Sequence, residues 1–320
     1  MRLLISGSIL ILAILLNGVV FAEESPLSER PYFDFYAESA HFLPVVDSAI
    51  SSARAELEVV LGDTLGYKPS VYIESSLERF RERIGSMVPD WGAAVAIPFR
   101  GQIIIKSPAN FRLGKSLYEL TKHEYAHLAL AERFGMVRPP RWLDEGLAMY
   151  TAFEWSWSNS FALSRAVTFG GLLSLEEIEG INRLDQNRAE TAYAQSYLAV
   201  KYLLDTYGVE ALNILIDSLS RKAPIESAMM AATGSDRDGF EQEYLNFLKG
   251  RYNLLTLFID MSYLWLFLAI VVVIGFVLRY RRKKKAYEQW DEEEKLQSTD
   301  FDYGDPDNPE EIEDEDKPWS

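Results

Sequence analysis

Hydrophobic and polar positions alternate in short runs through the first third of the chain and follow helical periodicity after it. The stretches "RPYFDFYAES" and "PSVYIESS" predict strands, and "GAAVAIPFRGQIIIKSP" predicts two strands around a turn at residues 99–101. Helical periodicity covers residues 42–61, 77–84, 115–134, 141–154 and 189–207. This order predicts an α+β fold, with a small N-terminal mixed sheet packed on the helix at 115–134 and an all-helical part after it.

Two further blocks carry no charge, at residues 3–20 and 261–278. The first follows Arg2 and ends in small residues before Glu23, which is typical of a secretory signal peptide over residues 1–22. The second is long enough to cross a bilayer and predicts a single transmembrane helix within residues 254–280. The segment between them, residues 23–253, is then the folded extracytoplasmic domain.

A basic cluster follows the predicted span directly and consists of Arg279, Arg281, Arg282, Lys283, Lys284 and Lys285. Positive charge beside a membrane helix marks the cytoplasmic side, so residues 23–253 are expected on the opposite side of the cytoplasmic (inner) membrane. The acidic tail and the absence of cysteine favour a bacterial cell, in which that side is the periplasm. Residues 281–320 then comprise the basic juxtamembrane cluster and an acidic cytoplasmic tail. This acidic tail is expected to be disordered and to serve either as a solubilising extension or as a docking site for a protein partner.

The net charge of −16 is concentrated in this tail, where residues 286–320 carry 15 acidic residues against two lysines. The rest of the chain is close to neutral, which argues against a nucleic-acid partner. There is no cysteine, so thiol nucleophiles and thiolate metal ligands are excluded. Only three histidines occur, at positions 41, 123 and 127.

The stretch "TKHEYAHLALAERFG" places two of these histidines four residues apart on a predicted helix. Residues at this spacing share one helix face, so His123 and His127 can present both imidazoles to one zinc ion. The carboxylate of Glu124 lies beside that face, where a general base can take a proton from water. The alternative is an ordinary amphipathic helix whose histidines are core or surface residues.

A catalytic zinc site needs a third protein ligand, and "RWLDEGLAMY" offers Glu145 early in the next predicted helix. A short turn containing Pro139 and Pro140 can bring this helix back against the first. Two histidines and one glutamate form a known catalytic zinc set. The sequence therefore predicts Zn²⁺ held by His123, His127 and Glu145.

With these motifs, the chain resembles the gluzincin metallopeptidases, in particular the aminopeptidase N-like enzymes and the compact bacterial peptidase MA-like domains. The resemblance covers roughly residues 91–208 and implies that the same three residues bind zinc while Glu124 is the general base. It also implies a tyrosine that stabilises the oxyanion. In the stretch "TAYAQSYLAVKYLLDTYG" Tyr193 matches the tyrosine that these enzymes carry in a helix after the third zinc ligand, and Tyr197 one turn later is the alternative.

One feature of the aminopeptidases is missing, because residues 92–105 contain no acidic residue to bind the free amine of a substrate. The expectation is therefore a membrane-anchored metallopeptidase that acts as an endopeptidase on polypeptides, with an edge strand pairing with the substrate. Two alternatives stay open: a catalytically silent binding or scaffolding module with an acidic docking tail, and hydrolysis of a non-peptide amide.

Overall fold

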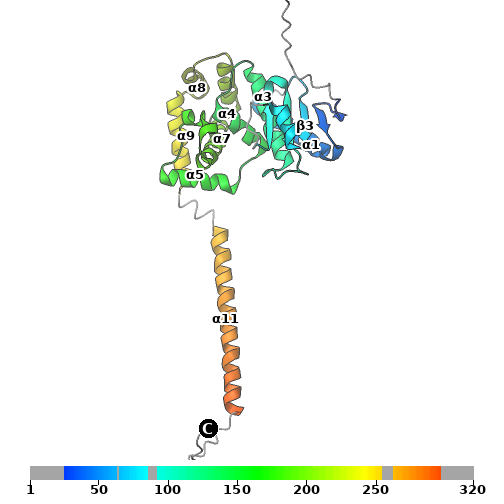
Figure 1. Cartoon of the computed structure of the whole chain (residues 1–320). Helices are drawn as coiled ribbons and strands as arrows, with labels where there is room; N and C mark the ends of the chain where they lie inside the picture. The colour runs from blue at the N-terminus through cyan, green and yellow to red at the C-terminus, as the bar shows by residue number, and fades with distance from the viewer. Residues whose placement is uncertain (1–24, 63–64, 86–91, 254–261, 297–320) are drawn as a thin grey trace, which may run out of the picture. The chain divides into compact units, whose positions relative to one another are not determined.

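A computed structural model of the chain describes residues 25–62, 65–85, 92–253 and 262–296, which form two compact units (Figure 1). The units are Met1–Leu257 and Phe258–Ser320. The expected signal peptide, residues 1–22, lies outside the described residues.

A five-stranded mixed sheet forms the N-terminal part of the first unit. Its strands are β1 (Ser28–Glu29), β2 (Asp34–Ala37), β3 (Ser70–Glu74), β4 (Ala94–Ile97) and β5 (Gln102–Lys106), in the order β1-β2-β3-β5-β4. The pairs β2–β3 and β3–β5 are parallel, and the two outer pairs are antiparallel. The last four strands were predicted from alternation, whereas the two residues of β1 are too few to give such a signal.

The two faces of the sheet belong to different hydrophobic clusters, because side chains along a strand point alternately to opposite sides. One face presents Val71, Ile73, Ile103 and Ile105 to the main core, which includes α1 (Leu43–Leu61) and α3 (Leu117–Phe134). The other face presents Tyr72 and Ile104 to α2 (Leu77–Ile84). The sheet therefore packs on α3, as the sequence predicts.

Helix α3 has strong local signals at both ends. At its start the Ser116 side chain accepts from the backbone N–H of Glu119, whose carboxylate accepts from the backbone N–H of Ser116. At its end Gly135 adopts a positive φ of 59°. Helix α4 (Arg141–Ala152) begins directly after Pro140, has Phe153 as its C-cap residue, and packs against α3.

The rest of the first unit is helical, which confirms the predicted α+β class. It contains α5 (Trp157–Phe169), α6 (Leu175–Ile178), α7 (Gln186–Ser220), α8 (Ile225–Thr233) and α9 (Arg237–Arg251). Helix α7 is interrupted at Gly208, where φ is 83° and ψ is 174°, so the predicted end of a helix at this glycine is confirmed. Helix α4 packs mainly on α7, and Figure 1 shows both among the helices labelled beside α3.

In the second unit the structure describes one long helix, α11 (Ser262–Leu296). By length and composition, residues Leu264–Glu293 of this helix qualify as a membrane span. The helix continues through the basic cluster to Leu296, which corrects the expectation of disorder for the start of the acidic tail. Residues such as Glu, Lys and Gln favour a helix that is already nucleated by an apolar segment. The remainder of the tail, residues 297–320, lies outside the described residues.

Candidate active site

Helices α3 and α4 bring three side chains to one point in the first unit. His123 and His127 lie one turn apart on α3, and Glu145 lies in the second turn of α4. One atom from each of them falls within 4.8 Å of the others, so the three can hold one metal ion. The sequence grouped the same three residues, while the third histidine, His41, lies in the short helix at Ala40–Phe42.

The donor atoms are arranged around a common centre. Oε2 of Glu145 lies 3.6 Å from Nε2 of His123 and 3.9 Å from Nε2 of His127. Ligand atoms of a tetrahedral zinc site with bonds near 2.1 Å are separated by about 3.4 Å, so the spacing suits zinc with a small contraction. Two imidazole nitrogens and one carboxylate oxygen are also a donor set that zinc accepts. The residues present therefore fit this metal.

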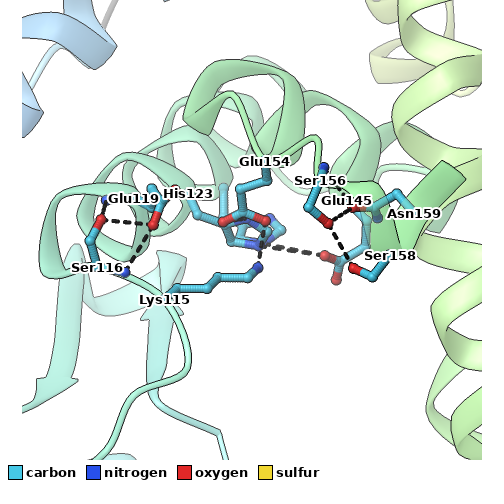
Figure 2. A network of polar contacts seen from close by, with 10 residues as sticks. Lys115, Ser116, Glu119, His123, Glu145, Glu154, Ser156, Ser158 and Asn159 are labelled. Atoms are coloured by element: carbon cyan, nitrogen blue, oxygen red, sulfur yellow. Dashed lines mark hydrogen bonds and ion pairs between the residues drawn. The ribbon is translucent and has the colours of Figure 1, made fainter. Parts of the chain in front are cut away.

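The other nitrogen of each imidazole faces a carboxylate. Nδ1 of His127 lies 2.6 Å from Oδ1 of Asp144, and Nδ1 of His123 lies 3.1 Å from Oε1 of Glu154. Glu154 is buried and is held by Lys115, whose Nζ donates to Oε2 at 2.5 Å (Figure 2). The carboxylate of Asp144 keeps the proton of His127 on Nδ1, so that Nε2 can bind a metal. The contact of His123 with Glu154 is an ion pair, and a metal that binds His123 must displace the proton on Nε2.

Glu145 has its own partner on the same helix. Arg141 lies one turn earlier, and its Nη2 is 2.7 Å from Oε1 of Glu145. Its Nη1 is 3.4 Å from Oδ2 of Asp144. The guanidinium thus forms an ion pair with Oε1 of Glu145, the oxygen that does not face the two histidines.

Charges in this small volume displace the pKa values from their usual ranges. Burial lowers the pKa of His123, but Glu154 and Glu145 outweigh it and raise that pKa to about 10. Burial raises the pKa of Glu145, but the contact with His123 and the charges of His127 and Arg141 outweigh it and bring that pKa to about 2. Glu145 is therefore an anion at any physiological pH, as a metal ligand must be.

Glu124 lies next to this group and is 7% exposed. Burial raises its pKa above the usual range, and this effect exceeds the opposing influence of His123 and His127. Its carboxylate accepts a hydrogen bond from the backbone of Ala96 in β4, the strand at one end of the described sheet. This contact orients the carboxylate between the histidine pair and the sheet.

The two candidate tyrosines on α7 have different surroundings. Tyr193 interacts electrostatically with Glu145, Arg141, Glu124 and Glu154, whereas the ring of Tyr197 packs on Trp155 with centroids 4.9 Å apart. Burial and the charge of Glu145 raise the pKa of Tyr193 to about 12, so its hydroxyl keeps its proton at neutral pH. Of the two tyrosines, Tyr193 is therefore the one whose pKa responds to the charge of Glu145.

The glycine after Glu145 explains how closely α7 approaches α4. A Cβ built on Gly146 would collide with the backbone oxygen of Ser196 and would lie 2.7 Å from Cγ2 of Val200. Only a residue without a side chain allows this approach. Because Ser196 lies one turn after Tyr193 and Gly146 directly follows Glu145, this contact holds the helix segments that carry Glu145 and Tyr193 close together.

Sequence reasoning missed several side chains around the site. Arg141 could have been found, since it precedes Glu145 by four residues and such pairs meet on a helix. Glu154 and Lys115 gave no signal, because their contacts with each other and with His123 depend on how the segments after α4 and before α3 fold back.

Two comparisons with known proteins bear on this arrangement. A family model described as the Peptidase MA superfamily matches residues 52–250, which include His123, His127 and Glu145. The Bacillus subtilis (strain 168) protein described as "Uncharacterized protein YhcO" is 27% identical to the chain over 137 residues. That match spans 40% of the chain and 40% of the relative.

Proposed function

The chain belongs to the Peptidase MA superfamily, and from this membership and the site geometry we propose that it is a zinc-dependent metallopeptidase of the gluzincin type, anchored in a membrane. The observation that carries the proposal is the convergence of two imidazole Nε2 atoms and one carboxylate oxygen from two adjacent helices. Both imidazoles also have a carboxylate beside Nδ1, an arrangement typical of zinc ligands.

In this proposal His123, His127 and Glu145 hold the ion, and Asp144 and Glu154 orient the two imidazoles. Zinc held by these residues would supply a Lewis acid for the peptide carbonyl and would lower the pKa of water. Glu124 takes a proton from the attacking water onto its carboxylate and then delivers a proton to the departing amine. Its buried position and raised pKa support this part, because both make the carboxylate a stronger base.

We assign oxyanion stabilisation to Tyr193. Its hydroxyl keeps a proton well above neutral pH and can donate a hydrogen bond to the carbonyl oxygen as negative charge develops there. Its electrostatic coupling to both Glu145 and Glu124 supports this assignment over Tyr197.

The substrate in this proposal is an extended polypeptide cleaved internally. Strand β4 pairs with β5 through Val95 and Ile104 and has no second partner among the described strands. Its other edge, next to Glu124, would accept backbone hydrogen bonds from a peptide. Residues 92–105, which contain β4, have no carboxylate to bind a free N-terminal amine. This supports an endopeptidase over an aminopeptidase.

The proposed location combines the candidate span in α11 with the charge pattern around it. The basic cluster after the apolar part of α11 and the expected signal peptide at residues 1–22 both favour an extracytoplasmic domain over residues 23–253. The tail after the cluster would then lie in the cytoplasm, where a protein partner could bind it.

Metal analysis tests the proposal directly. Purified full-length protein should contain about one zinc per chain, because the three donors form one site. A chelator should abolish hydrolysis of a casein-type or peptide-library substrate and lower the melting temperature, since a ligand that binds only the folded state stabilises it. Adding back one equivalent of zinc should restore both.

A His127→Ala variant is the matched control for this experiment. It should contain no zinc and should melt at the same temperature with and without chelator. Wild-type protein with both histidines intact that takes up no zinc would contradict the proposal. Zinc binding without any hydrolysis would instead favour the silent binding module.

The two tyrosines can be separated by removing one hydroxyl at a time. Tyr193→Phe should lower kcat by about 10²-fold with little change in KM, because a hydrogen-bond donor to the oxyanion acts in the transition state. Tyr197→Phe should leave kcat within about twofold, since its ring packing is kept. Zinc content should be unchanged in both variants, and the reverse kinetic pattern would assign the role to Tyr197.

A further inference from the structure

Arg141 is a charged side chain to which the proposed mechanism gives no task. It is the first residue of α4, and its guanidinium is only 22% exposed. Its backbone N–H donates to the carboxylate of Glu179 at 2.8 Å, so the start of the helix is fixed independently of the side chain. The guanidinium is therefore free to act on its neighbours, Asp144 and Glu145.

The two oxygens of Glu145 have different partners. Oε1 is 2.7 Å from Nη2 of Arg141. Oε2 is the oxygen that lies 3.6 Å and 3.9 Å from the two imidazole Nε2 atoms. A carboxylate without such a partner can rotate and present both oxygens to a cation, as carboxylates often do.

The same guanidinium also acts on His127, through Asp144. Its Nη1 lies 3.4 Å from Oδ2 of Asp144, whose Oδ1 is 2.6 Å from Nδ1 of His127. Arg141 thus spans two adjacent carboxylates, one that faces the metal-binding group and one that orients a histidine. A planar guanidinium with several fixed donors suits this bridging contact better than an ammonium group does.

We propose that Arg141 is a positioning residue that makes Glu145 a one-oxygen ligand, by holding Oε1 so that only Oε2 faces His123 and His127. This rests on the proposed zinc site. Catalytic zinc sites use three protein donors and keep a further position for water, and a second oxygen from Glu145 would supply a fourth protein donor. The function of Arg141 is therefore to keep the donor count at three.

The test is the visible spectrum of full-length protein in which cobalt(II) replaces zinc, because band intensity falls as the coordination number rises above four. Arg141→Met should give weaker bands than wild type and about 10- to 100-fold lower activity, the range for outer partners of metal ligands. Arg141→Lys, which retains one charged donor, should restore the spectrum at least in part. Arg138→Met is the matched control, because Arg138 is exposed and precedes α4, and its spectrum should equal that of wild type.

A wild-type spectrum in a folded Arg141→Met variant overturns the proposal. If that variant does not fold, Arg141→Gln replaces it as the neutral variant, and unfolding of both assigns Arg141 to stability and also overturns the proposal. Wild-type protein that binds neither zinc nor cobalt refutes the proposed function instead, so the two failures are distinguishable.

Discussion

Replacing Glu124 with glutamine should leave the zinc content and melting temperature unchanged while lowering kcat by about 10²- to 10⁴-fold, the range for general acid–base catalysis. The amide has almost the same shape as the carboxylate, and its oxygen can still accept the hydrogen bond from Ala96. It cannot take a proton from water. Activity on a quenched fluorescent peptide, measured with zinc content on the same sample, provides the test.

The matched control is Glu132→Gln, because Glu132 lies on the same helix but accepts from the backbone N–H of Gly66 at 3.1 Å, away from the histidines. This exposed change should leave kcat within about twofold. Full activity in Glu124→Gln would remove Glu124 from the mechanism. Loss of zinc from that variant would show that Glu124 supports metal binding, which the proposal does not assign to it.

The central part of the site was predictable from sequence because it depends on short-range geometry. A spacing of four residues puts His123 and His127 on one face of any helix, and the capping residue Ser116 and Gly135 fix where this helix begins and ends. Only six residues separate α3 from α4, so α4 must turn back and bring Glu145 toward the histidines. Alternating hydrophobic positions predicted strands β2 to β5 because this pattern, too, depends only on residues close together in the sequence.

The surroundings of the site were not predictable, because they depend on contacts between distant segments. Glu154 reaches His123 only because the chain after α4 folds back along α3, where Lys115 also contacts it. The choice between Tyr193 and Tyr197 depends on the rotation of α7 against α4, which periodicity along α7 does not determine. Their different partners appear only once both helices are placed.

The position of α7 leads to the second large effect, which concerns stability. Gly146→Ala should lower the free energy of unfolding by about 1–3 kcal/mol, the usual cost of overpacking a core. In an isolated helix this change would stabilise by about 1 kcal/mol, because alanine favours helix. Here the new methyl group would collide with the backbone of Ser196, which cannot move without shifting α7. Denaturant unfolding followed by circular dichroism measures the difference.

Gly250→Ala is the matched control, because Gly250 lies in α9 and a Cβ there would meet no atom within 4 Å. It should be neutral or stabilising by up to about 1 kcal/mol. The shift of α7 in Gly146→Ala should also move Tyr193 away from Glu145, so kcat should fall in protein that is still folded and still holds zinc. Unchanged stability and unchanged kcat in Gly146→Ala would mean that α4 and α7 can separate freely, and the close approach at Gly146 would then not determine the position of Tyr193.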